Sequence, residues 1–329
     1  METLNKNLVK KDIKGYFCKH GDFWIDPIKP VKRALITHAH FDHISFGCEE
    51  YICSPETGSL LKERIGNKIK IKSYGYDEIF KINGIKISFH PSGHILGSSQ
   101  IRLEGGDEKW LITGDFKRQG DDTCLSYQEV KTDFLICEST FALPIFNWAS
   151  TNIIIDEIVD WVNKSPNMTS ILFCYSLGKA QRLLNELKNK KLKKIYVHTN
   201  IKKINDIYIK QGIKLKDIPK IDREIKPKDF KGNLLLMPPS QNKSNLLKRF
   251  GDYQTAFASG WMLIRALKNR SGYDRGFAIS DHADWNGLIN TIKSCKAKKV
   301  FLDHGNGESL AKYLSIEENI EIQPFKINQ

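Results

Sequence analysis

Short apolar runs and strict alternation of apolar and polar residues mark strands along the first 140 residues. The predicted strands cover residues 23–25, 34–36, 79–89, 100–103, 110–113 and 134–137. Asn83-Gly84 interrupts the third of these runs, and Gly105-Gly106-Asp107 separates the fourth from the fifth, as turns do in β-hairpins. The pattern predicts a mostly antiparallel sheet in this half of the chain.

The middle of the chain has longer segments with helical spacing between single apolar strands. Helices are predicted at residues 153–162 and 179–187, and strands at 171–174, 195–197, 234–237 and 255–258. Strands that alternate with helices are typical of a parallel α/β unit, so a new domain is expected to begin near Trp148. Near Phe277 the pattern changes again to a strand at 276–279, a helix, and a strand at 299–302.

Positive charge is concentrated in that middle segment. The whole chain has a net charge of +13, whereas residues 149–277 contain 25 Lys and Arg against 11 Asp and Glu, a net charge of +14. A lysine bias of the genome would spread evenly, so the segment is interpreted as a basic face for a polyanion such as nucleic acid. A merely solvated lysine-rich surface is the alternative.

The remaining composition indicates an enzyme-sized globular protein of 329 residues. No apolar stretch approaches the roughly 20 residues that span a bilayer, and the N-terminus lacks the apolar core of an export signal. The seven cysteines have no zinc-finger spacing, and several lie in apolar runs. We therefore expect a cytoplasmic protein with buried free thiols and no membrane contact.

Histidines cluster at the predicted strand ends. Six of the nine lie in turns beside acids or glycines: His38, His40, His43, His94, His282 and His304. The other three (His20, His90 and His198) are interpreted as ordinary surface or core residues. Strand ends hold accessible loops on a rigid scaffold, so the six histidines are candidates for an active site.

The segment His38-x-His40-x-Asp42-His43 directly follows the predicted strand 34–36. Its spacing lets the first two imidazoles reach one cation, while Asp42 and His43 reach a second. Imidazole and carboxylate ligands suit zinc, with manganese as an alternative. The segment predicts half of a two-metal hydrolase site.

This segment and its surroundings resemble the metallo-β-lactamase fold, an αββα sandwich. In that resemblance Asp26 orders the ligand loop without binding metal, His94 in Ser92-Gly93-His94 is a ligand, and Asp115 in Thr113-Gly114-Asp115 is the bridging carboxylate. Without the resemblance, the turn-former interpretation of Asp115 is the less favoured alternative.

Three further residues resemble the markers of the β-CASP nuclease branch of that family. They are Glu138 in Cys137-Glu138-Ser139-Thr140, His282 in Ser280-Asp281-His282, and His304 in Asp303-His304-Gly305. The resemblance implies a metallo-β-lactamase domain in two parts, residues 1–148 and 278–329, and a parallel α/β β-CASP insertion at residues 149–277.

The resemblance also implies the division of work in the site. His38, His40 and His94 would bind one divalent metal; Asp42, His43 and His304 would bind the other; Asp115 would bridge them and so take part in catalysis. Two such metals activate water for attack on phosphorus. His282 would assist the leaving oxygen as a catalytic residue, with Glu138 orienting it.

Two segments of the insertion are candidates for nucleic-acid contacts. Lys179 and Arg182 lie in a Leu-Gly-Lys-Ala-Gln-Arg turn, which resembles a β-CASP motif and could present both cations to phosphates, although such turns often only cap a helix. Ser259-Gly260-Trp261 resembles a motif of Artemis-like DNA nucleases, although Trp261 could equally be a core or interdomain residue.

Over nearly its full length the chain resembles the bacterial ligase-associated DNA exonuclease family, with departures at Phe41 and Asp303. The resemblance implies trimming of DNA ends in repair, with DNA as the preferred nucleic acid and a functional association with a DNA ligase and a helicase. An RNA-processing β-CASP nuclease is the alternative. A non-catalytic nucleic-acid-binding subunit is disfavoured, because every ligand position is filled.

Overall fold

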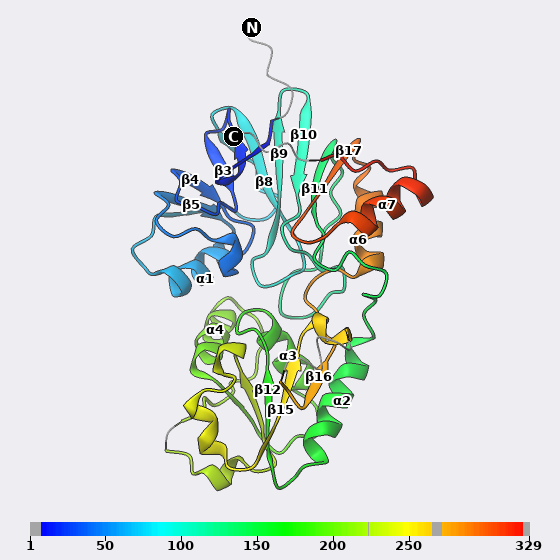
Figure 1. Cartoon of the computed structure of the whole chain (residues 1–329). Helices are drawn as coiled ribbons and strands as arrows, with labels where there is room; N and C mark the ends of the chain where they lie inside the picture. The colour runs from blue at the N-terminus through cyan, green and yellow to red at the C-terminus, as the bar shows by residue number, and fades with distance from the viewer. Residues whose placement is uncertain (1–7, 223, 265–271, 325–329) are drawn as a thin grey trace. The chain divides into compact units, whose positions relative to one another are not determined.

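The computed structural model describes residues 8–222, 224–264 and 272–324. The chain separates into two compact units (Figure 1). The first unit contains Met1–Ile145 and His282–Gln329, and the second unit contains Phe146–Asp281. The return to the first unit at His282 brings the C-terminal strand and helices back to the N-terminal part of the chain.

Two six-stranded sheets form the first unit. The first sheet has the spatial order β1 (Lys10–Asp12), β2 (Gly15–Cys18), β3 (Phe23–Ile25), β4 (Arg33–Leu35), β5 (Glu50–Cys53), β6 (Ile71–Ser73). The second sheet has the order β17 (Lys299–Asp303), β11 (Phe134–Glu138), β10 (Glu108–Ile112), β9 (Ser99–Gly105), β8 (Ile85–Pro91), β7 (Phe80–Ile82).

The prediction of one mostly antiparallel sheet is wrong, because both sheets mix parallel and antiparallel pairs. The strands β3 to β6 pair in parallel, as do β10, β11 and β17, whereas β1 to β3 and β7 to β10 pair antiparallel. Parallel neighbours need a crossover connection, and helix α1 (Pro55–Ile65) supplies one between β5 and β6. The hairpins at Asn83-Gly84 and Gly105–Asp107 are the antiparallel part that the turn residues predicted.

A shared apolar core lies between the two sheets. Ile25 and Ile52 of the first sheet belong to the same buried cluster as Ile87, Phe89 and other residues of the second. Strand β8 alternates only at its start, where Ile85 and Ile87 are buried and Lys86 is exposed, and all of its residues from Ile87 to Pro91 are buried. This arrangement leaves the opposite face of each sheet to be covered by helices.

Helices α6 (Trp285–Cys295) and α7 (Glu308–Glu317) cover the outer face of the second sheet. Leu288, Ile292 and Leu310 of these helices pack against Leu135 of β11 and Val300 of β17. Helix α1 packs beside β5 and β6 of the first sheet, so the unit has a layered order of helix, sheet, sheet, helix (Figure 1). The loops at one end of the sheets carry the predicted metal ligands.

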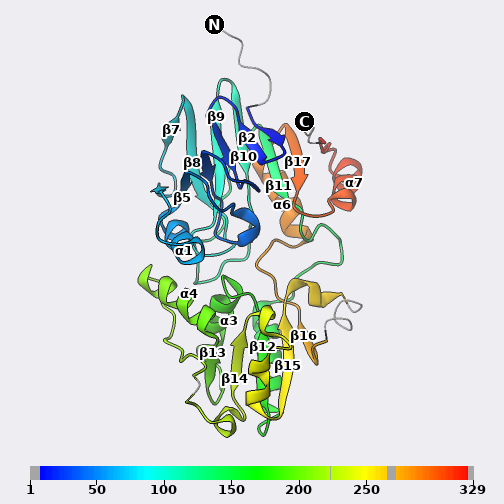
Figure 2. The same cartoon turned by 60° about the vertical axis from the view of Figure 1, so that its left-hand side comes forward.

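The second unit is built on a five-stranded parallel sheet, visible in Figure 2. Its spatial order is β13 (Ile195–Val197), β14 (Leu234–Met237), β12 (Thr169–Phe173), β15 (Tyr253–Ala258), β16 (Arg275–Phe277). The predicted strand at 276–279 therefore belongs to this unit and not to the C-terminal part, because β16 pairs with β15.

Both faces of this sheet are buried, as in other parallel sheets. Helices α2 (Thr151–Asn163), α3 (Lys179–Leu187) and α4 (Thr199–Lys210) pack on one face, where Leu172 is buried. The short 3-10 helices η2 (Pro227–Phe230) and η4 (Asn245–Phe250) pack on the other, with Ile171 and Phe173. The remaining 3-10 helices are η1 (Phe41–His43), η3 (Pro239–Gln241) and η5 (Gly260–Leu263).

The cysteines agree with the expectation of buried free thiols. All seven cysteines are free thiols, and all except Cys124 are buried. In the described parts of the chain, no helix has both the length and the hydropathy that crossing a bilayer requires.

Candidate functional site

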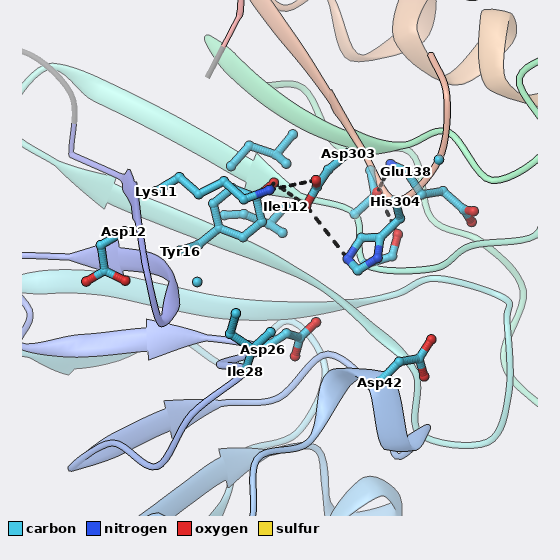
Figure 3. Close-up of a pocket in the computed structure, with 15 residues that line it drawn as sticks. Lys11, Asp12, Tyr16, Asp26, Ile28, Asp42, Ile112, Glu138, Asp303 and His304 are labelled. Atoms are coloured by element: carbon cyan, nitrogen blue, oxygen red, sulfur yellow. Dashed lines mark hydrogen bonds and ion pairs between the residues drawn. The ribbon is translucent and has the colours of Figure 1, made fainter. Parts of the chain in front are cut away.

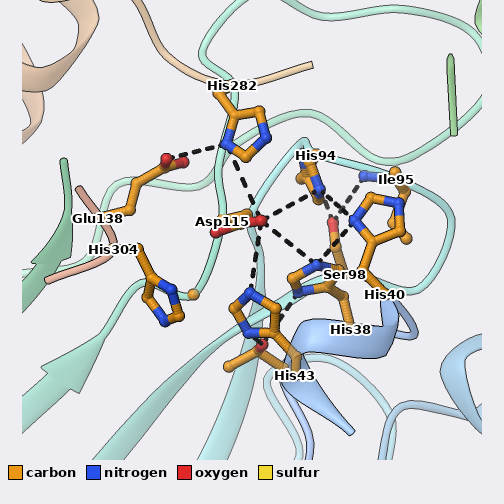
Figure 4. Close-up of polar contacts among 12 residues, drawn as sticks. His38, His40, His43, His94, Ile95, Ser98, Asp115, Glu138, His282 and His304 are labelled. Carbon is orange, nitrogen blue, oxygen red and sulfur yellow. Dashed lines mark hydrogen bonds and ion pairs between the residues drawn. The ribbon is translucent and has the colours of Figure 1, made fainter. Parts of the chain in front are cut away.

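Three histidines and one aspartate from separate loops meet in the first unit (Figure 4). His38 and His40 follow strand β4, His94 lies between β8 and β9, and Asp115 follows β10. Nδ1 of His40 lies 3.1 Å from Nε2 of His38 and 3.1 Å from Nε2 of His94. Oδ2 of Asp115 lies 3.5 Å from Nε2 of His38 and 3.6 Å from Nε2 of His94.

These separations fit the edges of a coordination tetrahedron. A zinc ion with ligands at about 2.0–2.1 Å separates neighbouring donor atoms by about 3.3–3.4 Å. Burial, with a contribution from the neighbouring His43, lowers the pKa of His38 well below its usual value. The imidazole is therefore neutral, which is the form that binds metal. The four residues fit a divalent cation.

Asp115 is the centre of a wider group of histidines. Its Oδ2 also lies 3.5 Å from Nε2 of His43 and 3.9 Å from Nδ1 of His282. Burial favours the protonated carboxyl, but His43 and His282 hold the pKa of Asp115 well below its usual range. The carboxylate is thus ionised and faces imidazoles on several sides, as a ligand shared between two cations would.

Asp26 fixes the ring of His43. Its two oxygens accept hydrogen bonds from Thr37 N at 2.8 Å and Thr37 Oγ1 at 2.5 Å, and Oδ2 lies 2.7 Å from Nδ1 of His43. Nε2 of His43 is then directed to Asp115 and is buried without a hydrogen-bond partner. A buried nitrogen without a partner is costly unless a ligand such as a metal satisfies it.

The electrostatics at His43 also favour a cation. Burial disfavours a charged imidazole, yet Asp115 and Asp26 together hold the pKa of His43 well above its usual value. Two buried carboxylates thus stabilise positive charge at this point. A divalent cation at Nε2 would supply that charge in place of a proton.

His304 and Asp42 lie at the edge of this group. The His304 ring stacks on that of His43, with 4.7 Å between the ring centroids. Its loop is held by Ser139, whose Oγ donates to the carbonyl of Asp303 at 2.8 Å. Both His304 and Asp42 line a cavity of about 410 Å³ (Figure 3).

The structure does not bring Asp42, His43 and His304 into one compact set of donor atoms. Among the described residues, the compact groups are His38, His40, His94 with Asp115, and Asp115 with Glu138 and His282. Asp42 is exposed on η1 and belongs to neither group. The second set of ligands therefore stays a prediction.

Glu138 and His282 form a carboxylate–histidine pair. Glu138, the last residue of β11, accepts from Phe116 N at 2.6 Å and Thr140 Oγ1 at 2.6 Å, and its Oε2 lies 2.9 Å from Nδ1 of His282. Only 2% of Glu138 is exposed, so its position is well defined. With Nδ1 directed to Glu138, proton transfer to a substrate would go through Nε2 of His282.

The sequence pattern missed Thr37 and Thr140, which hold the two supporting carboxylates, Asp26 and Glu138. Each lies next to a recognised segment, Thr37 directly before His38 and Thr140 two residues after Glu138. A hydroxyl so close in the sequence could have been proposed as a hydrogen-bond partner. Only the folded loop shows which carboxylate it contacts.

The predicted nucleic-acid contacts lie in the second unit and have internal partners. Lys179 and Arg182 are 2% and 3% exposed. Their cationic groups lie 3.0 Å and 3.2 Å from Oδ1 of Asp281, and Arg182 also donates to Thr151 Oγ1 at 2.8 Å. These contacts hold α3 to the segment before His282, and a contact with phosphate stays a prediction.

Trp261 is more accessible than either cation, with 39% of its surface exposed. It lies on η5, and its ring meets Phe146 edge to face at 5.5 Å between centroids. Part of the indole is thus engaged in packing within the second unit, so both interpretations of Trp261 stay open.

Replacing Asp26 by Asn is expected to weaken metal binding at His43. The amide cannot accept from both Thr37 and the His43 ring as the carboxylate does, and loss of such a supporting partner costs about 10- to 100-fold in metal affinity or activity. Metal titration by calorimetry measures the effect, with Asp133→Asn as a matched control, since Asp133 pairs only with Lys298 at the surface. Unchanged affinity would contradict the role of Asp26.

Comparison with known proteins gives matches of different length, and no family model matches. The chain is 28% identical over 305 residues to a "Probable DNA ligase" of Opitutus terrae, which covers 91% of this chain and 29% of the ligase. It is 40% identical over 122 residues to "Endoribonuclease YSH1" of Yarrowia lipolytica, covering 36% of this chain and 14% of that protein. It is 27% identical over 203 residues to an "RNase J-like protein" of Methanocaldococcus jannaschii, covering 52% and 48%.

The chain therefore spans less than half the length of each of these relatives. Its fold is also that of a solved protein of unknown function from Enterococcus faecalis, with a TM-score of 0.60, 14% identity, and coverage of 90% of this chain and 79% of that one. None of these names is that of a ligase-associated DNA exonuclease, so that part of the resemblance is not confirmed. The relatives named YSH1 and RNase J-like are members of the β-CASP branch of the metallo-β-lactamase family, and the chain is similar to them over part of its length.

Proposed function

We propose that this protein is a metal-dependent nuclease that hydrolyses phosphodiester bonds. The observation that carries the proposal is the convergence of four histidine nitrogens, 3.5–3.9 Å away, on the single oxygen Oδ2 of Asp115. An ionised carboxylate in that position can be shared by two cations, and a pair of divalent cations is a common device for phosphodiester hydrolysis.

The first unit would be a metallo-β-lactamase sandwich and the second unit its β-CASP insertion. The layered order of helices and sheets in the first unit supports the former, and the names of the relatives support both. The net charge of +14 on residues 149–277 supports a polyanionic substrate, because basic surfaces raise the affinity for nucleic acid.

The proposed division of the ligands between the two cations is the one predicted from the sequence. His38, His40 and His94 would hold one cation, and Asp115 would be shared. The second cation would be held by the remaining predicted ligands: Asp42, His43 and His304. Zinc fits the imidazole-rich set, and manganese is the alternative.

When bound, two such cations lower the pKa of a water molecule and neutralise charge on the phosphate oxygens. The chain itself supplies the orientation and the proton transfer. Asp26 keeps Nε2 of His43 directed to Asp115, and Glu138 holds His282 through Nδ1. Nε2 of His282 would donate a proton to the leaving oxygen, which converts a poor leaving group into an alcohol.

The names of the nuclease relatives favour RNA as the substrate. The relatives with nuclease names are endoribonucleases or RNase J-like, so we propose RNA processing as the main activity. DNA is the second candidate, because the match that covers 91% of this chain is to a probable DNA ligase. That observation also supports an association with DNA ligation.

Purified protein is expected to contain about two divalent transition-metal ions per chain and to lose cleavage activity in EDTA. The assay uses end-labelled RNA, single-stranded DNA and duplex DNA of one sequence with Zn²⁺ or Mn²⁺, and metal content is measured by mass spectrometry. Faster cleavage of RNA is expected. Faster cleavage of DNA would reverse the order of the two substrates, and activity that ignores EDTA in a metal-free protein would refute the metal-dependent mechanism.

A further inference from the structure

Two neighbouring phenylalanines form an exposed aromatic surface on the first unit. Phe41 and Phe46 are 54% and 58% exposed, although large apolar side chains are usually buried. Their rings are nearly parallel, with an interplanar angle of 20° and 6.2 Å between centroids. We call Phe41 and Phe46 the aromatic platform.

The platform adjoins the candidate metal site along the chain. Phe41 is the first residue of η1 and stands between His40 and Asp42, both predicted ligands. The 3-10 turn returns the backbone so that His43 is buried while Phe41 faces outward. The exposed Phe41 ring is therefore one residue away from a predicted ligand on each side.

Arg64 completes the platform from the last turn of α1. Its guanidinium carbon lies 3.7 Å from the centroid of the Phe41 ring, a cation–π contact. Burial, opposed by the charge of Asp42, lowers the pKa of Arg64 to about 10, so the guanidinium remains charged at neutral pH. Among the described residues it forms no ion pair, so its charge is available to an anion close to Asp42.

We propose that the aromatic platform stacks an unpaired nucleobase of the substrate strand, with Arg64 beside the adjacent phosphate. The inference rests on the proposed function and specifies that the substrate at the metal site is single-stranded. Exposed aromatic rings bind bases through their π-faces, which a duplex hides between neighbouring base pairs. The platform thus selects single-stranded nucleic acid at the metal site.

A nucleobase fits these observations better than a protein partner does. The platform consists of two rings with a cation on one side, whereas a protein interface needs a patch of several hundred Å² or more. Its Phe41 also lies within one residue of two predicted ligands, where the proposed function requires a phosphodiester strand to be held.

The test is direct binding in EDTA, where cleavage is not expected. Fluorescence anisotropy measures Kd for a labelled single-stranded oligonucleotide and for the same strand with stable abasic residues in place of its bases. The wild type is expected to bind the base-bearing strand at least about tenfold more tightly, the range expected for stacking one base. Phe41→Ala and Phe46→Ala are expected to remove most of that difference.

Two control variants make the result specific. Phe41→Tyr keeps an aromatic face and is expected to keep the difference. Ile79→Ala removes another exposed apolar side chain, 68% exposed, directly before the edge strand β7, and is expected to change nothing. Circular dichroism confirms that each variant is folded.

Three outcomes would overturn the proposal. The wild type could bind the base-bearing and abasic strands with the same Kd. The two alanine variants could keep the wild-type difference in Kd, or they could bind both strands more weakly by the same factor. An unchanged difference would assign the exposed rings to a protein contact. Failure of the proposed function is distinguishable, because it would appear as absence of metal and of cleavage while this binding test is unaffected.

Discussion

Replacing Asp115 by asparagine is expected to reduce phosphodiester cleavage by on the order of a thousandfold or more, since removal of even one electrostatic contact in an active site costs about 10²- to 10³-fold. Oδ2 of Asp115 lies 3.5–3.9 Å from four histidine nitrogens. The amide has the same shape but no charge, so repulsion between two cations would no longer be offset. Metal content measured by mass spectrometry should fall in parallel with activity.

The control for this variant is a carboxylate outside the site. Asp133→Asn removes the same charge at a surface ion pair with Lys298 and is expected to keep full metal content and activity. Without metal, Asp115→Asn is also expected to lower the melting temperature, because His43 and His282 hold the pKa of Asp115 well below its usual range and so stabilise its charge in the folded state. If Asp115→Asn retained both metals and cleavage, the shared-ligand role would be wrong.

Local patterns predicted several elements to the residue. Strands β3, β13 and β14 and helix α3 have the bounds that the sequence indicated. Each is a compact apolar or amphipathic segment with clear flanking turns, so local preference and tertiary packing agree. Strands whose pairing depends on distant partners were harder to predict from the sequence. The three-residue strands β1 and β6 have no distinctive pattern of their own, and the parallel neighbours of β5 cannot be inferred from its sequence.

In the site, too, some features follow from the local sequence and others depend on the tertiary fold. Close spacing along the chain placed His38 and His40 together. The resemblance added His94, which the fold brings to 3.1 Å from His40, and Asp115, which it brings to 3.5 Å from His38. The sequence could not show that Asp42 would be exposed on η1 and lie outside the compact groups of donor atoms. Nor could it show that Lys179 and Arg182 would meet Asp281, about a hundred residues later, instead of solvent. Such pairings are set by the tertiary fold.

The substrate was the least predictable property. The sequence favoured DNA through resemblance to one nuclease family, whereas the relatives with nuclease names support RNA at least as well. The metal site cannot decide between them, because both polymers present the same phosphodiester group. Discrimination depends on contacts with the sugar and bases, such as the 2′-hydroxyl.

Replacing His282 by alanine is expected to slow cleavage by about 10²- to 10⁴-fold, the usual contribution of a positioned general acid or base. Metal content should remain near that of the wild type. Glu138→Gln should slow cleavage less, by about 10- to 100-fold, because it leaves the imidazole in place but removes the carboxylate that orients it. Rates are measured across pH, and the dependence on imidazole protonation should disappear in His282→Ala.

The structure makes this pair of variants decisive, because His282 has two possible roles. Nδ1 of His282 lies 2.9 Å from Glu138 and 3.9 Å from Asp115, and these three residues also form a compact group of donor atoms. If His282 were a metal ligand, His282→Ala would lose metal and activity together. If it transfers a proton, metal is retained, and a substrate with a better leaving group, such as a p-nitrophenyl phosphodiester, should lose less rate. Glu138 then acts only through His282, so the double variant should be no slower than His282→Ala alone.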